Sequence, residues 1–236
     1  MVINVSDDVR NGGNVLYLQN VLSETFTCAD CKVETETKGE RINLKVICPD
    51  HYGEIVRTEI MDKTAETVAI NYKYNFFKKA VKVQGLNQVE REILLASLIS
   101  ADLPEDKKYC YQRFKDLNSV AIDGVYNFRL KPLRKQWEDI ASYMPLVFMR
   151  SQLNEFIKFL LENKKKKAYV DGGKVYDSHY RRLKRVNLLD GECAKITREI
   201  LLSGCGQIEI SGKTNSEDEY YLREFYGDKI IFSTGY

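Results

Sequence analysis

The spacing of hydrophobic residues changes twice along this chain, and those changes limit the folds open to it. Strand-like alternation dominates near the start, a helical period runs through the middle, and both patterns occur near the end. The sequence therefore predicts an α+β fold of three segments, 1–53, 54–166 and 167–236. Because the outer two are too short to form separate cores readily, we expect all three to pack as one unit. The outer two would share one sheet or dock on the helical middle.

The first segment is predicted to be a small α/β piece. Val2–Val5 alternates like a strand, and a helix is expected between Asp8 and Ser23. The stretch from Cys31 to Cys48 is rich in Thr, Val and Ile on both arms and indicates a β-hairpin. Gly39-Glu40 suits a two-residue type II′ turn, because glycine readily adopts positive φ. This register places Cys31 directly opposite Cys48.

The middle segment is predicted to contain about five helices. Asn87 and Glu90 have the spacing of a capping box, Pro104 suits a first helical turn, and Pro132 should kink or split its helix. The expected helices cover residues 51–83, 87–101, a stretch from Pro104, a stretch from Asp123 through Trp137, and residues 146–163.

The last segment is predicted to run helix–strand–helix–strand after a short hairpin around Asp171–Gly173. The first helix would start at Asp190 and end before Gly204, and Ser216 would open the second with a capping box. The strands are expected at 207–211 and 229–233. A strand–helix–strand unit implies a parallel strand pair.

The composition argues against several classes of protein. The charged share is 30%, yet the formal net charge is only +2, which argues against a strongly basic nucleic-acid binder. No secretory signal and no apolar run of the roughly 18–20 residues needed to cross a bilayer is found. We therefore expect a cytoplasmic protein without membrane insertion, whose cysteines are free thiols or metal ligands.

Four potential zinc ligands, Cys28, Cys31, Cys48 and His51, gather near the N-terminus. The hairpin register would bring Cys31 and Cys48 together, with Cys28 and His51 flanking the same open end. Three cysteines and one histidine are an accepted tetrahedral set for one structural zinc, with no position left for catalysis. Two alternatives stay open: buried thiols that pack as small apolar groups, or a redox pair of Cys28 and Cys31.

A basic segment follows the helical middle. Lysines and arginines interleaved with tyrosines can bind phosphates and stack on bases, although runs of charge are more often solvated faces. The possible contacts to an anion or a nucleic acid are Lys164, Lys165, Lys166, Lys167, Arg181, Arg182, Lys184 and Arg185.

Several short motifs resemble the YtxC-like sporulation protein family of endospore-forming bacteria. They are Gly-Val-Tyr-Asn-Phe-Arg-Leu-Lys at 124–131, Asn-Glu-Phe-Ile-Lys-Phe-Leu-Leu at 154–161, the late helix and strand at 199–210, and Phe-Tyr-Gly-Asp-Lys-Ile at 225–230. The resemblance extends from about Ile55 to the C-terminus. The sequence departs from the family pattern at Pro132 and at the lysine run 164–167. The resemblance implies a role in sporulation, and it carries over no catalytic residue.

The sequence contains no nucleophile elbow, phosphate loop or dinucleotide fingerprint. We therefore expect no enzyme, and no cofactor beyond the zinc, but a cytoplasmic protein that acts by interaction with a protein partner. The alternatives are a nucleic-acid-binding module with a structural zinc, or a thiol redox protein using Cys28 and Cys31.

Overall fold

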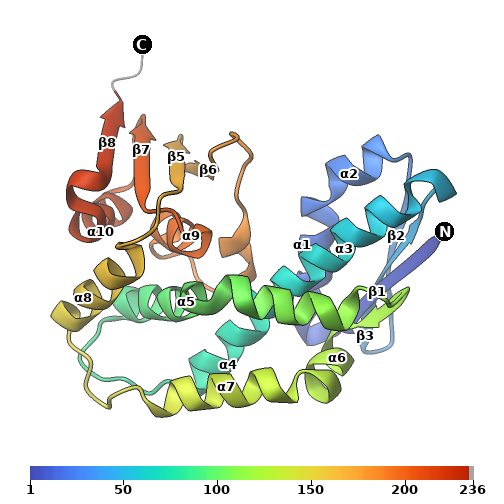
Figure 1. Cartoon of the computed structure of the whole chain (residues 1–236), viewed down its shortest axis with the longest axis horizontal. Helices are drawn as coiled ribbons and strands as arrows, with labels where there is room; N and C mark the ends of the chain where they lie inside the picture. The colour runs from blue at the N-terminus through green and yellow to red at the C-terminus, as the bar shows by residue number, and fades with distance from the viewer. Residues whose placement is uncertain (234–236) are drawn as a thin grey trace. The chain divides into compact units, whose positions relative to one another are not determined.

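The chain passes between two compact units three times (Figure 1). In this computed structural model, which describes residues 1–233, the first unit comprises Met1–Asn75 and Leu103–Ile140. The second comprises Phe76–Asp102 and the chain from Ala141 onward. Both contain helices and strands, which confirms the predicted α+β class. The expected helical middle, 54–166, contributes to both units.

The first unit contains a four-stranded sheet. Its strands are β1 (Val2–Asp8), β2 (Lys32–Lys38), β3 (Arg41–Ile47) and β4 (Ser119–Ala121), in the order β2-β3-β1-β4. β3 runs antiparallel to both β1 and β2, and β4 pairs with β1 in parallel. The sequence analysis missed β4, because three residues are too few to show a period.

The β2–β3 hairpin confirms the predicted register and turn. Lys38 pairs with Arg41, and Lys32 pairs with Ile47. Gly39 has φ +58°, whereas Glu40 does not enter the positive-φ region, and this combination is the one that a type II′ turn requires. On β3, Ile42, Leu44 and Val46 face the core.

Helices cover this sheet and complete the first unit. α1 packs against β1 and β3 through Val15 and Leu18, both fully buried (Figure 1). Pro132 splits the predicted fourth helix in two, with Leu130 between the parts. The elements are η1 (Val9–Asn11), α1 (Gly12–Val21), α2 (Ser23–Cys28), η2 (Asp50–Tyr52), α3 (Gly53–Thr67), the π-helix η3 (Val68–Tyr72), α6 (Ile122–Arg129) and α7 (Lys131–Ser142).

Besides α7, whose last two residues lie in the second unit, two further helices contribute residues to both units. They are α4 (Lys73–Ala80) and α5 (Gln88–Phe114). The prediction that a new helix begins at Pro104 is wrong, because Pro104 lies inside the 27-residue α5. A proline inside a helix removes one backbone hydrogen bond. Burial of Leu103 and Asp106 beside it favours continuation of the helix.

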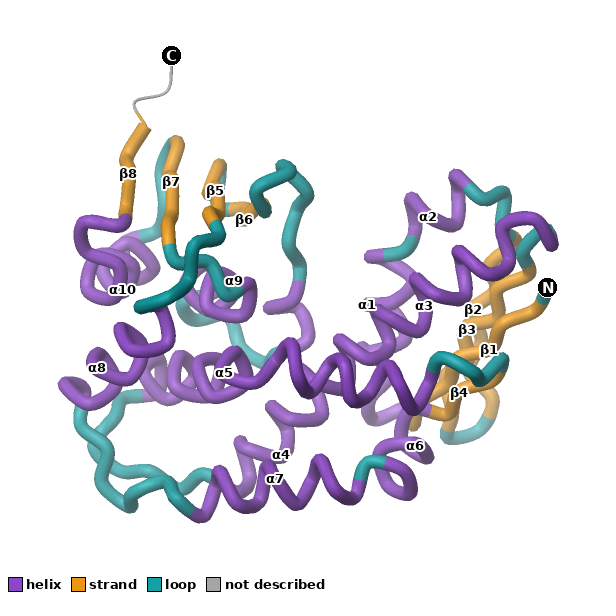
Figure 2. Tube along the Cα trace, viewed as in Figure 1, coloured by secondary structure: helices purple, strands orange, loops and turns teal. Residues whose placement is uncertain are grey.

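The second unit has its own sheet, in the order β6-β5-β7-β8 (Figure 2). The strands are β5 (Lys167–Asp171), β6 (Lys174–Tyr176), β7 (Gln207–Ser211) and β8 (Ile230–Ser233). β5 and β8 both run parallel to β7, which confirms the predicted parallel pair, and β6 is antiparallel to β5. The two α/β pieces therefore do not share one sheet.

The helices of the second unit correct the predicted helix starts at Leu146 and Asp190 and the predicted cap at Ser216, since Asn215 is the capping residue. These helices are α8 (Arg150–Leu161), η4 (Arg185–Leu188), α9 (Lys195–Ser203), α10 (Ser216–Tyr226) and η5 (Gly227–Lys229). α9 begins five residues after the predicted start at Asp190. The reason is tertiary: the buried carboxylate of Asp218 accepts hydrogen bonds from the backbone N–H groups of Ile196 and Thr197. Gly204, with φ +66°, ends the helix as predicted.

Within residues 1–233, no helix combines the length and the apolar character needed to cross a membrane.

Candidate functional site

The structure brings together two of the four predicted zinc ligands. Cys31 directly precedes β2 and Cys48 directly follows β3, and the Cys48 thiol lies close enough to raise the pKa of Cys31. Cys48 is buried and Cys31 is half-buried. Cys28 ends α2 with an exposed side chain, and the exposed His51 ring packs on Tyr52 with ring centroids 4.3 Å apart. The first unit thus contains a thiol pair with the other two candidates nearby in sequence.

The surroundings of Cys31 favour its protonated thiol. Burial, followed by the neighbouring Cys48 thiol, raises the pKa of Cys31 to about 12. Each sulfur also lies near a backbone carbonyl, Cys31 Sγ at 3.8 Å from Ala29 O and Cys48 Sγ at 3.4 Å from Pro49 O. Among residues 1–233, no group of three or more His, Cys, Asp or Glu side chains is arranged to hold a metal ion. The structural zinc therefore stays a prediction.

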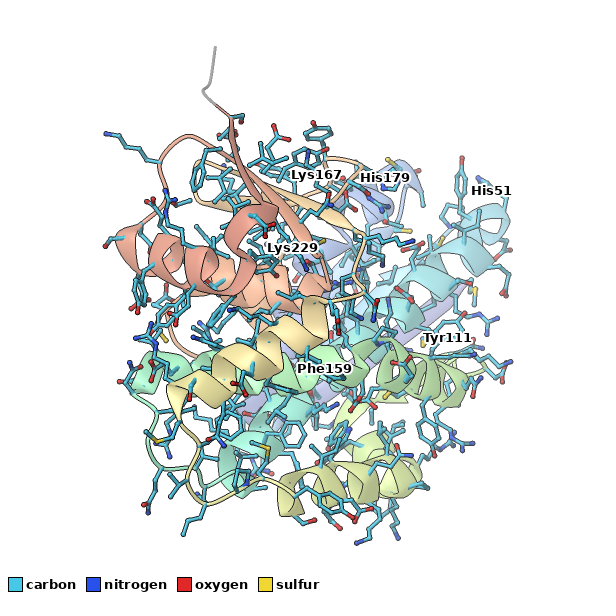
Figure 3. The ribbon with its side chains drawn as sticks, turned by 60° about the vertical axis from the view of Figure 1, so that its left-hand side comes forward. His51, Tyr111, Phe159, Lys167, His179 and Lys229 are labelled. Atoms are coloured by element: carbon cyan, nitrogen blue, oxygen red, sulfur yellow. The ribbon has the colours of Figure 1, made fainter. Side chains whose placement is uncertain are left out.

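A basic cleft of about 240 Å³ lies in the second unit. It is built by the start of β5, the loop that follows β6, the first residue of η4 and the end of α9. Lys167 and His179 lie near each other at this cleft (Figure 3). The residues that line the cleft are Lys166, Lys167, Asp177, Ser178, His179, Arg181, Leu183, Arg185, Ser203 and Cys205.

Asp177 holds the loop of the cleft in shape. Its carboxylate accepts hydrogen bonds from the backbone N–H groups of His179 at 2.8 Å and Arg181 at 3.0 Å. The Arg181 guanidinium also donates to it at 3.0 Å. Partial burial works to raise the pKa of Asp177, but these donors outweigh it and lower the pKa. The carboxylate is thus ionised at neutral pH and fixes the backbone at His179 and Arg181 together with the Arg181 guanidinium.

Two tyrosines stand beside the basic side chains. The rings of Tyr169 on β5 and Tyr180 in the loop stack with centroids 4.6 Å apart and planes 23° apart. Lys167 Nζ lies 4.9 Å from the centre of the Tyr169 ring and 2.6 Å from a carboxylate oxygen of Glu209. Tyr180 is 69% exposed and has the unusual φ of +56°. A positively charged cleft with an exposed aromatic ring is suited to binding a phosphate and a flat base.

The eight basic residues predicted to contact an anion lie in three different places in the second unit. Lys166, Lys167, Arg181 and Arg185 line the basic cleft. Arg182 and Lys184 line a neighbouring cleft of about 150 Å³, and Lys164 and Lys165 are exposed. The sequence indicated the charge of this region correctly, whereas the structure decides which side chains converge.

Six further residues line the cleft and were not predicted, and four of them, besides Ser178 and Leu183, add distinct chemistry. Asp177 organises the loop, His179 adds a titratable ring, and Ser203 and Cys205 enter from the end of α9. His179 sits in a polar, basic stretch and gave no periodic signal. Ser203 and Cys205 are distant in sequence, and the parallel pairing of β5 with β7 brings them to the cleft.

Comparisons with family models, with curated proteins and with solved structures find no match for this chain. The resemblance to the YtxC-like sporulation family therefore stays a prediction.

Proposed function

We propose that this protein acts by binding rather than by catalysis, and that its basic cleft binds a single-stranded nucleic acid. The observation that carries the proposal is the convergence of Lys166, Lys167, Arg181 and Arg185 beside the exposed ring of Tyr180. Phosphates would contact the cations, and a base would stack on Tyr180.

The charge of the segment supports this proposal more than the charge of the whole chain does. From Lys164 to Arg185 the sequence has nine lysines and arginines against two aspartates, although the full chain is nearly neutral. One aspartate, Asp177, is engaged with Arg181. Local positive potential of this kind attracts a polyanion and makes its binding depend strongly on salt.

The test is fluorescence anisotropy of the full chain with a labelled oligothymidine strand and its RNA counterpart at low and moderate salt. We expect the double variant Lys166→Gln, Arg181→Gln, in which both altered side chains line the basic cleft, to bind about tenfold or more weakly and to show a smaller salt dependence. These two side chains are exposed, so the fold should survive. Lys79→Gln with Lys82→Gln, also exposed and in the same unit, is the matched control. Absence of binding by the unmodified protein at low salt would refute the proposal.

An apolar cleft favours a second candidate function, the binding of a protein partner in the sporulation context that the family resemblance implies. This cleft of about 390 Å³ lies between α5 and α8. Phe159 at its edge is 71% exposed, and Leu94, Leu98, Phe148 and Phe156 line it. Exposed apolar surface rimmed by polar residues is typical of protein interaction sites. Phe159→Ser should abolish co-purification of a specific partner while strand binding is unchanged.

A further inference from the structure

The β2–β3 hairpin ends in a position where two side chains are especially close. The register runs to Lys32 opposite Ile47, so the next residues, Cys31 and Cys48, also oppose each other. In an antiparallel pair, opposed residues alternate between positions that exchange backbone hydrogen bonds and positions that do not. The side chains approach more closely at the positions that do not exchange backbone hydrogen bonds.

The backbone hydrogen bonds show that Cys31 and Cys48 occupy a non-hydrogen-bonded position of the antiparallel pair. The N–H of Cys48 donates to Met1 O at 3.0 Å, and Cys48 O accepts from the N-terminal amine of Met1 at 2.8 Å. The N–H of Cys31 donates to Phe26 O at 2.9 Å. These groups are thus directed away from the facing cysteine. Such pairs have Cα atoms about 4.5 Å apart, which falls within the range that a disulfide spans.

We propose that Cys31 and Cys48 form a reversible cross-strand disulfide when the protein meets a low-molecular-weight disulfide. The half-buried Cys31 is the thiol that a small disulfide in solvent can reach, and the buried Cys48 is the resolving thiol beside it. This assignment differs from a Cys28–Cys31 redox pair, because the ladder orients Cys48, and not Cys28, across from Cys31.

The disulfide would form in two thiol–disulfide exchange steps. The Cys31 thiol loses its proton to solvent and attacks one sulfur of the small disulfide, which forms a mixed disulfide and releases one thiolate. Cys48, also deprotonated, then attacks the Cys31 sulfur, breaks the mixed disulfide and releases the second thiolate. The two protein thiols are oxidised by two electrons in total. The small disulfide is reduced to two thiols, which take up the two protons.

The bond would have a defined structural effect. It would close the loop 32–47 at the open end of the hairpin, opposite the Gly39 turn. It would also join the turn after α2 to the segment that enters η2 and α3. The first unit would therefore unfold at a higher temperature when oxidised, because the unfolded chain would be constrained.

The test exposes the full chain to oxidised glutathione, blocks the remaining thiols with an alkylating agent and maps the peptides by mass spectrometry. We expect the count of titratable thiols in denaturant to fall from the six of the sequence by two, with one cross-linked peptide joining Cys31 to Cys48. Cys28→Ser should form the same cross-link, whereas Cys48→Ala should stop at glutathione attached to Cys31.

Three results would overturn the proposal. They are a cross-link between Cys28 and Cys31, a glutathione adduct on Cys31 that persists in the unmodified protein, or stoichiometric zinc that protects both thiols from oxidation. The wild-type peptide map decides the matter even if Cys48→Ala fails to fold.

Discussion

In the interior of the first unit, Lys73 Nζ lies 2.7 Å from Oδ2 of Asp106, and both side chains are almost completely buried. The indole N–H of Trp137 donates to the same carboxylate oxygen at 3.0 Å. Lys73 directly follows the π-helix η3, and Asp106 lies in α5. A buried cation and a buried anion thus join two helices with an aromatic side chain of α7.

Removal of the cation alone should be strongly destabilising. Lys73→Met removes the cation that lies beside the buried Asp106 carboxylate, so we expect the free energy of unfolding to fall by about 3–5 kcal/mol. Lys73→Met combined with Asp106→Asn removes both charges and keeps an acceptor for Trp137, so it should recover much of that loss. Urea denaturation measures both variants. An equal loss in the single and double variants would contradict the role assigned to the ion pair.

The pair Arg41–Asp123 should make the stability of the first unit depend on pH. The Arg41 guanidinium donates to the two oxygens of Asp123 at 3.1 and 2.7 Å and lowers the pKa of Asp123. Because the folded pKa is below the unfolded value of about 3.9, the stabilisation is present above that value. It is lost as pH falls through the folded pKa.

Asp123→Asn should therefore cost about 1 kcal/mol at neutral pH, since both side chains are partly exposed and solvent screens the pair. In thermal melts, the difference from wild type should decrease as the pH falls below about 4 and should vanish only below the folded pKa of Asp123. Asp116→Asn, an exposed carboxylate of the same unit, is the control. A difference in stability between the variant and wild type that stays constant down to the lowest pH measured would contradict the predicted dependence on the ionisation of Asp123.

Gly206 positions the lysine run against β7. A Cβ atom at this residue would overlap the backbone carbonyl of Lys164, and the N–H of Gly206 donates to Lys166 O at 2.9 Å. Gly206→Ala must therefore displace the backbone of the lysine run, which we expect to cost about 2 kcal/mol. Strand binding should weaken as well. Gly13→Ala, where an added Cβ meets no atom within 4 Å, should leave binding unchanged in the same anisotropy assay.

Tyr180 should contribute stacking but little charge recognition. Tyr180→Asn removes the ring, and asparagine tolerates the positive φ at this position better than most residues do. Stacking on one base is worth about 1–3 kcal/mol, so oligothymidine binding should weaken about fivefold or more. Inorganic polyphosphate, which has no base, should compete equally well for both proteins. An equal loss for polyphosphate would mean that the ring only supports the loop.

The local sequence pattern predicted the structure correctly wherever a short stretch of chain determines its own conformation. Gly39 determined the hairpin turn and hence the facing of Cys31 and Cys48, and the alternation of Ile42, Leu44 and Val46 determined which side of β3 is buried. The parallel pair β7–β8 followed from a strand, a helix and a strand in order. Pro132 marked a helix boundary, because its missing N–H acts on the residues next to it.

Other features depended on residues far apart in the chain. Asp218 fixed the start of α9 from 21 residues away by accepting the N–H of Thr197. Burial around Pro104 let one helix continue where the local signal indicated a start.

The candidate sites show the same division. The sequence by itself determined where positive charge and thiols are concentrated, because composition is local. Only the tertiary structure decided that Lys167, Arg181 and Ser203 share one cleft, and that the side chains of Cys28 and His51 are exposed beside the facing Cys31 and Cys48. Strand pairing and loop geometry bring together groups that no short window of sequence contains, and convergence of groups in space is what binding requires.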